Sequence, residues 1–174
     1  MTKEEIIDQL RVNHKAFTDF ILKLDEKEFL FVVKNKWTAG QQAAHILRSV
    51  KPVTLAFGLP LFLLRIVFGK ANRPSRGYGT LVHRYYDKLA AGGKASGRFI
   101  PPEIAYSQKE KICNSIMAAT EILCSRAAKY SDNELDKYIL PHPLFGKLTY
   151  REMLYFTIYH VEHHHNNINE MLCM

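Results

Sequence analysis

The amino-acid sequence predicts an all-α fold, a four-helix bundle with a long crossover insert between the second and third main helices. Four S/T-x-x-E/Q capping boxes indicate four principal helices, because each box satisfies free backbone donors at a helix start. Few stretches alternate between apolar and polar residues as a half-buried strand does, and none pairs through a two-residue hairpin turn. A chain of 174 residues is long enough for one globular domain, which we expect to span residues 1–174.

The first two helices begin at threonine caps. Thr2 with Glu5 opens a helix over about residues 3–24. Thr38 with Gln41 opens the second helix, which we expect to end just before Pro52, because proline cannot donate a hydrogen bond inside a helix. The apolar stripe of the first helix comprises Ile6, Leu10, Phe17, Ile21 and Leu24.

The third and fourth helices follow the same pattern. Ser107 with Glu110 predicts a helix over about residues 108–130, and Thr149 with Glu152 predicts one from residue 150 to the end. The stretch PHPLFGKLT before the last helix favours a compact turn.

The connection over residues 55–102 is far longer than the two to eight residues usual between bundle helices. We therefore expect helices within it, at about 59–67 and 80–91. The apolar run 53–68 is too short and too interrupted for a membrane span, so we expect no transmembrane segment. Residues 59–68 are instead expected to be buried or to face a partner, with a homodimer as one outcome.

The net charge of +7 is concentrated in a Gly- and Pro-rich basic insert at about 69–102. Its charged residues comprise one acid, Asp87, and seven bases: Lys70, Arg73, Arg76, Arg84, Lys88, Lys94 and Arg98. Such a segment could follow nucleic-acid phosphates or anionic lipid, and a basic bundle of that kind is one alternative function. Because no recognisable nucleic-acid module surrounds it, we favour a solvated loop and expect no specific nucleic-acid partner.

The cysteines and the N-terminus point to a cytoplasmic protein. Three cysteines without a C-x-x-C spacing argue against a disulfide framework and against a thiolate zinc site. The N-terminus carries acidic residues where a signal peptide has a basic region and an apolar run.

The histidines supply the candidate site. His160 and His164 are four residues apart, so they share the helix face that Met153 and Ile168 mark as facing the core. His45, in the middle of the second helix, is the third candidate ligand for zinc, nickel or iron. By helical rotation His163 is a reserve ligand and His165 points outward. The alternative is that His45 is a core histidine bonded to a carbonyl and that His160 and His164 lie on the surface.

Two segments of the sequence resemble the DinB-like superfamily of bacterial proteins regarded as metalloenzymes, which includes the damage-inducible and YfiT-like proteins. WTAGQQAAHIL (37–47) is similar to the family's segment before its first metal histidine, and HVEHHHNNI (160–168) to its H-x-x-x-H helix. HPLFG (142–146) also resembles one branch. The chain departs from the family where many members have Arg-Gly-Gln after the second histidine of that motif.

The resemblance implies a four-helix bundle with a long crossover and a divalent metal, usually zinc or nickel, held by His45, His160 and His164. It also implies activation of water or a thiol, as in hydrolases or in transferases that use bacillithiol or mycothiol. The small-molecule substrate would then include a low-molecular-weight thiol.

Beside the ligands, the sequence suggests residues for the substrate. Arg73, Arg76 and Arg98 are candidate clamps for an anionic cosubstrate, and Trp37 a pocket wall. No general base emerges, because Glu162 points off the ligand face. Cys113 and Cys124 are expected to be inert inside a helix. The non-catalytic alternative is a helical binding or structural module with a vestigial metal site.

Overall fold

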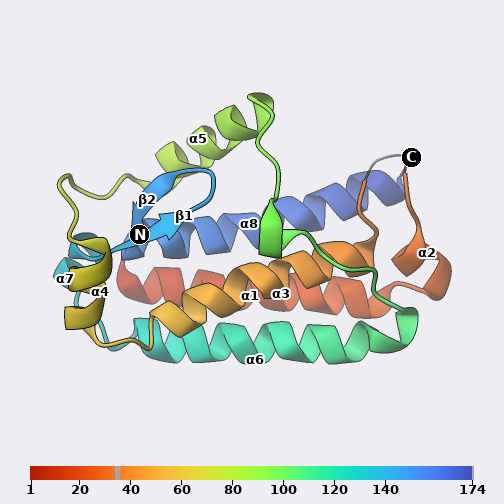
Figure 1. Cartoon of the computed structure of the whole chain (residues 1–174). Helices are drawn as coiled ribbons and strands as arrows, with labels where there is room; N and C mark the ends of the chain where they lie inside the picture. Colours follow the sequence, from red (N-terminus) through yellow and green to blue (C-terminus); the bar gives the residue numbers. More distant parts are fainter. Residues whose placement is uncertain (34–35, 174) are drawn as a thin grey trace.

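A computed structural model describes residues 1–33 and 36–173, and it confirms the helical bundle. The four long helices are α1 (Lys3–Lys23), α3 (Ala39–Ala56), α6 (Lys109–Ala127) and α8 (Tyr150–Leu172). Each of α1 and α3 packs against both α6 and α8, so the four helices enclose one core (Figure 1). The largest fully buried side chains include Leu10, Phe17, Ile46, Ile116, Leu123 and Tyr150.

Three of the four predicted capping boxes are confirmed, namely those that begin at Thr2, Thr38 and Thr149. The prediction at Ser107 is wrong, because Ser107 lies in the 3-10 turn η2 (Tyr106–Gln108) and α6 begins at Lys109 without a side-chain cap. Boxes that the sequence analysis overlooked begin two short helices, α2 (Glu26–Leu30) and α7 (Asp132–Lys137).

Helix α3 continues past Pro52, which corrects the expected end before that residue. Pro52 has no N–H for the carbonyl of Arg48 one turn earlier, and Arg48 is itself an exposed residue. Val53 and Phe57, beyond the proline, are buried in the core. The Thr54 hydroxyl also lies within hydrogen-bonding distance of a backbone carbonyl of α6, at 3.1 Å. These contacts outweigh the one missing helical bond.

The long crossover contains the two helices that the sequence predicts, with slightly shifted ends. They are α4 (Leu61–Phe68) and α5 (Tyr78–Ala90), and the 3-10 turn η1 (Gly97–Phe99) follows. Helix α5 packs on α8, while η1 packs on α3. The crossover therefore returns to the groove between α3 and α8 (Figure 1).

A β-hairpin precedes α8 where we expected only a compact turn. Strands β1 (Ile139–His142) and β2 (Gly146–Thr149) pair antiparallel, with His142 opposite Gly146 across a three-residue loop. Gly146 has a φ of +77°, which favours glycine at the end of such a loop. The strands were missed because each has four residues and the loop is not the two-residue type.

Among the described residues, no single helix is long and apolar enough to cross a membrane. Helices α3 and α4 reach the necessary length and composition only as a pair, and they meet at an angle of 109°.

An ion pair ties the crossover to the beginning of α8. The fully buried carboxylate of Glu152 accepts hydrogen bonds from both terminal nitrogens of Arg73, at 2.6 and 2.8 Å, and from the backbone N–H of Arg76 at 2.8 Å. Burial raises the pKa of Glu152, but these bonds and one from the Thr149 N–H outweigh it and hold the pKa below its usual value. Glu152 is therefore an ionised anchor for the segment that precedes α5.

We expect Glu152→Gln to lower the free energy of unfolding by about 2–3 kcal/mol, since charge-assisted bonds to both arginines are lost while glutamine still fits the capping box. The deficit should shrink as the pH falls below about 4.5, the usual glutamate pKa, because the unfolded wild-type chain then binds a proton at Glu152 more readily than the folded protein does. Urea denaturation at several pH values measures both effects.

The matched control is Glu121→Gln, which removes an exposed ion pair with Arg11 and should cost less than about 1 kcal/mol. Equal effects of the two substitutions would contradict the anchoring role of Glu152.

Candidate metal centre

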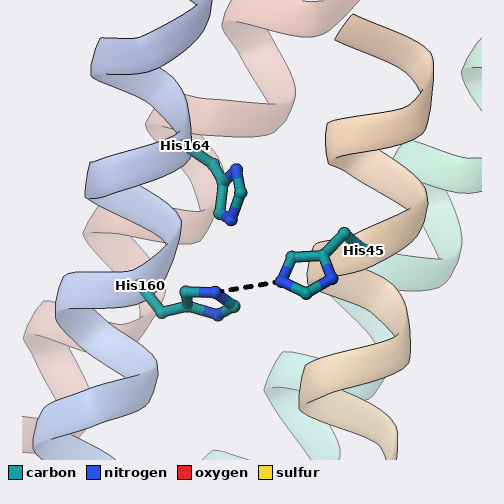
Figure 2. Close-up of side chains that lie close together, drawn as sticks. All are labelled: His45, His160 and His164. Carbon is teal, nitrogen blue, oxygen red and sulfur yellow. Dashed lines mark hydrogen bonds between the residues drawn. The ribbon is translucent and has the colours of Figure 1, made fainter. Parts of the chain in front are cut away.

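Three histidine side chains from two facing helices meet between α3 and α8. His45 comes from α3, and His160 and His164 are one turn apart on α8 (Figure 2). All three are at least 94% buried, and their nearest ring nitrogens lie within 4.8 Å of one another. The Nε2 atoms of His45 and His160 are 3.1 Å apart. The structure therefore brings together the three residues that the sequence proposes as ligands.

The ring of His45 is oriented by the backbone of the crossover. Its Nδ1 lies 2.7 Å from the carbonyl oxygen of Phe99 in η1. A carbonyl only accepts hydrogen bonds, so Nδ1 carries the proton and Nε2 has the free lone pair. The sequence-based alternative foresaw a carbonyl partner for His45, but it also placed His160 and His164 on the surface, where the structure does not put them.

The ring of His164 is oriented by a side chain of α3. Its Nδ1 lies 2.8 Å from Oε1 of Gln42, whose amide nitrogen in turn donates to the Trp37 carbonyl at 3.3 Å. These bonds fix which end of the glutamine amide faces the histidine. His164 therefore also has its proton on Nδ1 and its lone pair on Nε2, as metal-binding histidines commonly do.

The pKa values of all three imidazoles lie below the usual value, chiefly because of burial. The pKa of His160 and that of His164 are well below it, since each is fully enclosed and has other histidines beside it. Burial also lowers the pKa of His45, although its bond to Phe99 opposes the shift. The three rings are therefore neutral near pH 7, the state that a metal ligand requires.

The histidine cluster fits a divalent ion in chemistry and in size. Nitrogen ligands about 2.1 Å from zinc in a tetrahedral site lie about 3.4 Å apart, close to the spacing of His45 and His160. Within residues 1–33 and 36–173, no other group of three ligating side chains comes this close together.

A cleft of about 1050 Å³ adjoins the cluster and is lined by all three histidines. Its walls come from α3, α5, α8, the β-hairpin and the loop around η1. The charged side chains that line it are Lys36, Lys94 and Arg98, all of them cationic. The cleft is large enough for a small organic ligand and is electrostatically suited to an anionic one.

The predicted substrate residues separate into two groups. Trp37 and Arg98 line the cleft, with the Trp37 ring centroid 5.0 Å from that of His45. Arg73 and Arg76 are instead bound to Glu152 and are not among the residues that line the cleft. Part of the positive charge of the basic insert is thus neutralised within the fold.

Of the two further histidines of α8, only His165 differs from the rotational expectation. His163 is half-buried, lines the cleft and stands edge-on to Tyr85, with ring centroids 5.3 Å apart. His165 was expected to point outward, but it is half-buried against Phe20 of α1 at 4.5 Å between centroids. The prediction failed because α1 packs along that side of α8.

Sequence reasoning missed three groups that shape the site. Gln42 precedes His45 by almost one helical turn, so its place on the same face could have been read from the spacing. The Phe99 carbonyl belongs to the backbone and has no signal in the sequence. His142 lines the cleft, and its Nδ1 accepts the Leu144 N–H at 3.1 Å, so its Nε2 carries a proton.

The cleft holds no carboxylate that could act as a general base among its described residues. Glu162 is exposed and lies within 3.4 Å of Asn13 on α1, away from the cluster. Burial raises the pKa of Cys113 and of Cys124 to about 11, so both thiols keep their protons at neutral pH, as expected of inert buried cysteines.

Comparison with known protein families matches residues 9–168 to the DinB superfamily. Because the match spans most of the chain, the protein belongs to this superfamily, as the two sequence segments indicated. A comparison with curated proteins returned no match.

Metal-free protein should lose stability as the pH falls below about 6.5. Burial lowers the pKa of His14 and of His142 to about 4, and it holds that of His160 and that of His164 well below the usual value. The unfolded chain therefore binds protons first, and each such histidine costs about 1.4 kcal/mol per pH unit down to its folded pKa. Urea denaturation with a chelator present measures the slope.

Replacing His142 by asparagine should reduce that slope by about 1.4 kcal/mol per pH unit, the contribution of one bound proton. The matched control is His83→Asn, at an exposed position on α5. A free energy of unfolding that stays constant between pH 6.5 and 5 would contradict the neutral, buried state of these histidines.

Proposed function

We propose that this DinB-superfamily protein is a divalent-metal-dependent enzyme that acts on a small molecule in the cleft. The observation that carries the proposal is the convergence of three buried, neutral imidazoles beside an open cleft, with the lone pairs of His45 and His164 fixed on Nε2. Three protein ligands leave coordination positions for water or substrate, as catalytic sites require.

The ion is expected to be zinc or nickel, with iron as a third choice, because imidazole nitrogen suits all three. When bound, it supplies a Lewis acid that lowers the pKa of a coordinated water or thiol. The chain supplies the positions of the three rings through the Phe99 carbonyl and Gln42.

The remaining residues of the cleft bind and orient the substrate. Lys36, Lys94 and Arg98 attract an anionic group, and the Trp37 ring forms a wall next to His45. His142 offers an Nε2–H donor, since its Nδ1 is occupied and burial lowers its pKa to about 4. Burial raises the pKa of Tyr85, so its hydroxyl keeps its proton at neutral pH.

Thiol transfer is favoured over hydrolysis. A thiol has a pKa near 8.5, whereas water has one near 15.7, so a thiol needs far less help from a general base. The residues described along the cleft include no carboxylate for that role, and their charges suit an anionic low-molecular-weight thiol. We therefore propose thiol S-transfer as the reaction class and metal-dependent hydrolysis as the second candidate.

The setting of the protein is also proposed from the sequence and the surface. The three cysteines are unpaired, which suits a reducing compartment such as the cytoplasm.

The face of α4 that bears Phe62, Ile66 and Val67 is exposed, and a second copy of the chain is the partner proposed for it.

Metal and activity should be lost together. We expect tag-free protein to retain zinc, nickel or iron near one ion per chain, and His160→Ala/His164→Ala to retain almost none, because one nitrogen cannot hold the ion. Plasma mass spectrometry measures the metal, and assays of thiol conjugation and of ester hydrolysis measure activity before and after metal is restored.

His83→Ala is the control, since it removes an exposed histidine outside the cleft. A wild-type protein that binds none of the three ions would contradict the proposal and favour a non-catalytic module. A variant that loses the ion and also unfolds would indicate a structural ion.

Gln42→Met tests the orientation of His164. We expect it to weaken zinc binding by about 10- to 100-fold, because methionine fills the space but does not replace the amide oxygen that accepts the hydrogen bond from Nδ1–H. Competition with a chromophoric chelator measures the affinity. The control is Gln9→Met on α1, whose amide nitrogen donates to Asn13 at 2.6 Å. An affinity equal to that of the wild type would show that Gln42 does not hold the ring.

A further inference from the structure

The cleft continues along the bundle well beyond the histidines. On α3, its lining residues run from His45 to Leu55 and Ala56, and ten residues of helix span about 15 Å. On α8, they run from His160 back to Met153, about 10 Å. The Tyr150 hydroxyl donates to the Ala56 carbonyl at 3.2 Å, so these two ends lie together. The cleft therefore has an arm that leads from the candidate metal centre toward this end of α3.

Apolar side chains predominate in the lining of the cleft, and two large ones toward the end of α3 remain exposed. Leu55 is 64% exposed and Leu59 is 39% exposed, although both line the cleft. The other apolar residues that line the cleft include Val53, Phe68, Leu89, Leu140, Leu144 and Phe156. An apolar ligand that bound against these exposed leucines would shield their side chains from water, which favours binding.

Cationic side chains are found near the histidine end. Lys36 neighbours Trp37, whose ring is 5.0 Å from that of His45. Arg98 neighbours Phe99, whose carbonyl binds His45. Neither of these cations has an acidic partner among the ion pairs between described residues. An anionic head group is therefore favoured at this end, where the proposed metal would also bind it.

We infer that the cleft binds an amphiphilic anion, with its charged head beside the histidines, Lys36 and Arg98 and an unbranched hydrocarbon tail along the arm toward Leu59. This inference rests on the proposed function for the chemistry at the head, and it adds the class of substrate: a molecule with a medium-length acyl or alkyl chain. The tail site depends only on apolar residues, so it is present whether or not a metal is bound.

Calorimetric titration with dodecanoate, kept below the concentration at which it forms micelles, tests the inference on chelator-treated protein and on zinc-loaded protein. We expect one dodecanoate per chain in both forms and at least about 100-fold weaker binding of acetate, because acetate has the head but no tail to bury. Zinc should tighten dodecanoate binding without creating the site.

Two variants locate the tail and one locates the head. Leu55→Asp and Leu59→Asp should each weaken dodecanoate binding by about tenfold or more, since a carboxylate repels the ligand and is poorly solvated against its chain. Arg98→Gln should weaken binding mainly at low salt, where its charge is least screened. Because Leu55, Leu59 and Arg98 are all exposed, the fold should tolerate these changes, and circular dichroism verifies it.

Ile66→Asp is the matched control, because Ile66 is 75% exposed on α4 but does not line the cleft. Equal affinities for dodecanoate and acetate, or no effect at Leu55 and Leu59, would overturn the inference and leave the metal proposal intact. An effect of Ile66→Asp as large as that of Leu55→Asp would place the ligand on the outer face of α4 and also overturn it. Dodecanoate binding by protein that takes up no metal would refute the proposed function and support the tail site.

Discussion

Three imidazoles that face one another in a buried space impose the main constraint on this structure. Each ring has two nitrogens that need partners, and away from water an unpaired one is costly. His45 and His164 each satisfy Nδ1 with a dedicated acceptor, the Phe99 carbonyl and the Gln42 amide. Their Nε2 atoms are left to face the cluster, where Nε2 of His45 lies 3.1 Å from Nε2 of His160. A divalent ion bound between them would be a single partner for all three rings.

The path of the crossover serves to position the histidine rings and to form part of the cleft. Its long path returns η1 to α3, where the Phe99 carbonyl reaches His45, and it contributes α5 and Arg98 to the walls of the cleft. Glu152 fixes the beginning of that path through Arg73 and Arg76. Two arginines that looked like ligand clamps in the sequence are thus part of the scaffold. The cationic character of the cleft depends on Lys36, Lys94 and Arg98, the charged residues that the fold leaves facing it.

The sequence predicts the bundle and the histidine cluster because both depend on local periodicity. The threonine caps mark three helix starts, and the four-residue spacing of His160 and His164 places them on one face. The predictions that proved wrong concern features that depend on tertiary contacts. Pro52 stays inside α3 because Val53 and Phe57 are buried beyond it. Arg73 forms an ion pair with Glu152, and His165 packs on Phe20. Both contacts join segments that are distant in the sequence, which helical periodicity does not predict. The backbone carbonyl of Phe99 leaves no trace in side-chain patterns.

The most direct test of this account is a crystal structure of zinc-soaked protein with anomalous data collected on both sides of the zinc absorption edge. The account predicts one strong anomalous peak between α3 and α8, about 2.1 Å from the Nε2 atoms of His45, His160 and His164, with the bonds to Phe99 and Gln42 preserved. A peak bound by other residues, or full-occupancy zinc elsewhere with this cluster unchanged and empty, would contradict it.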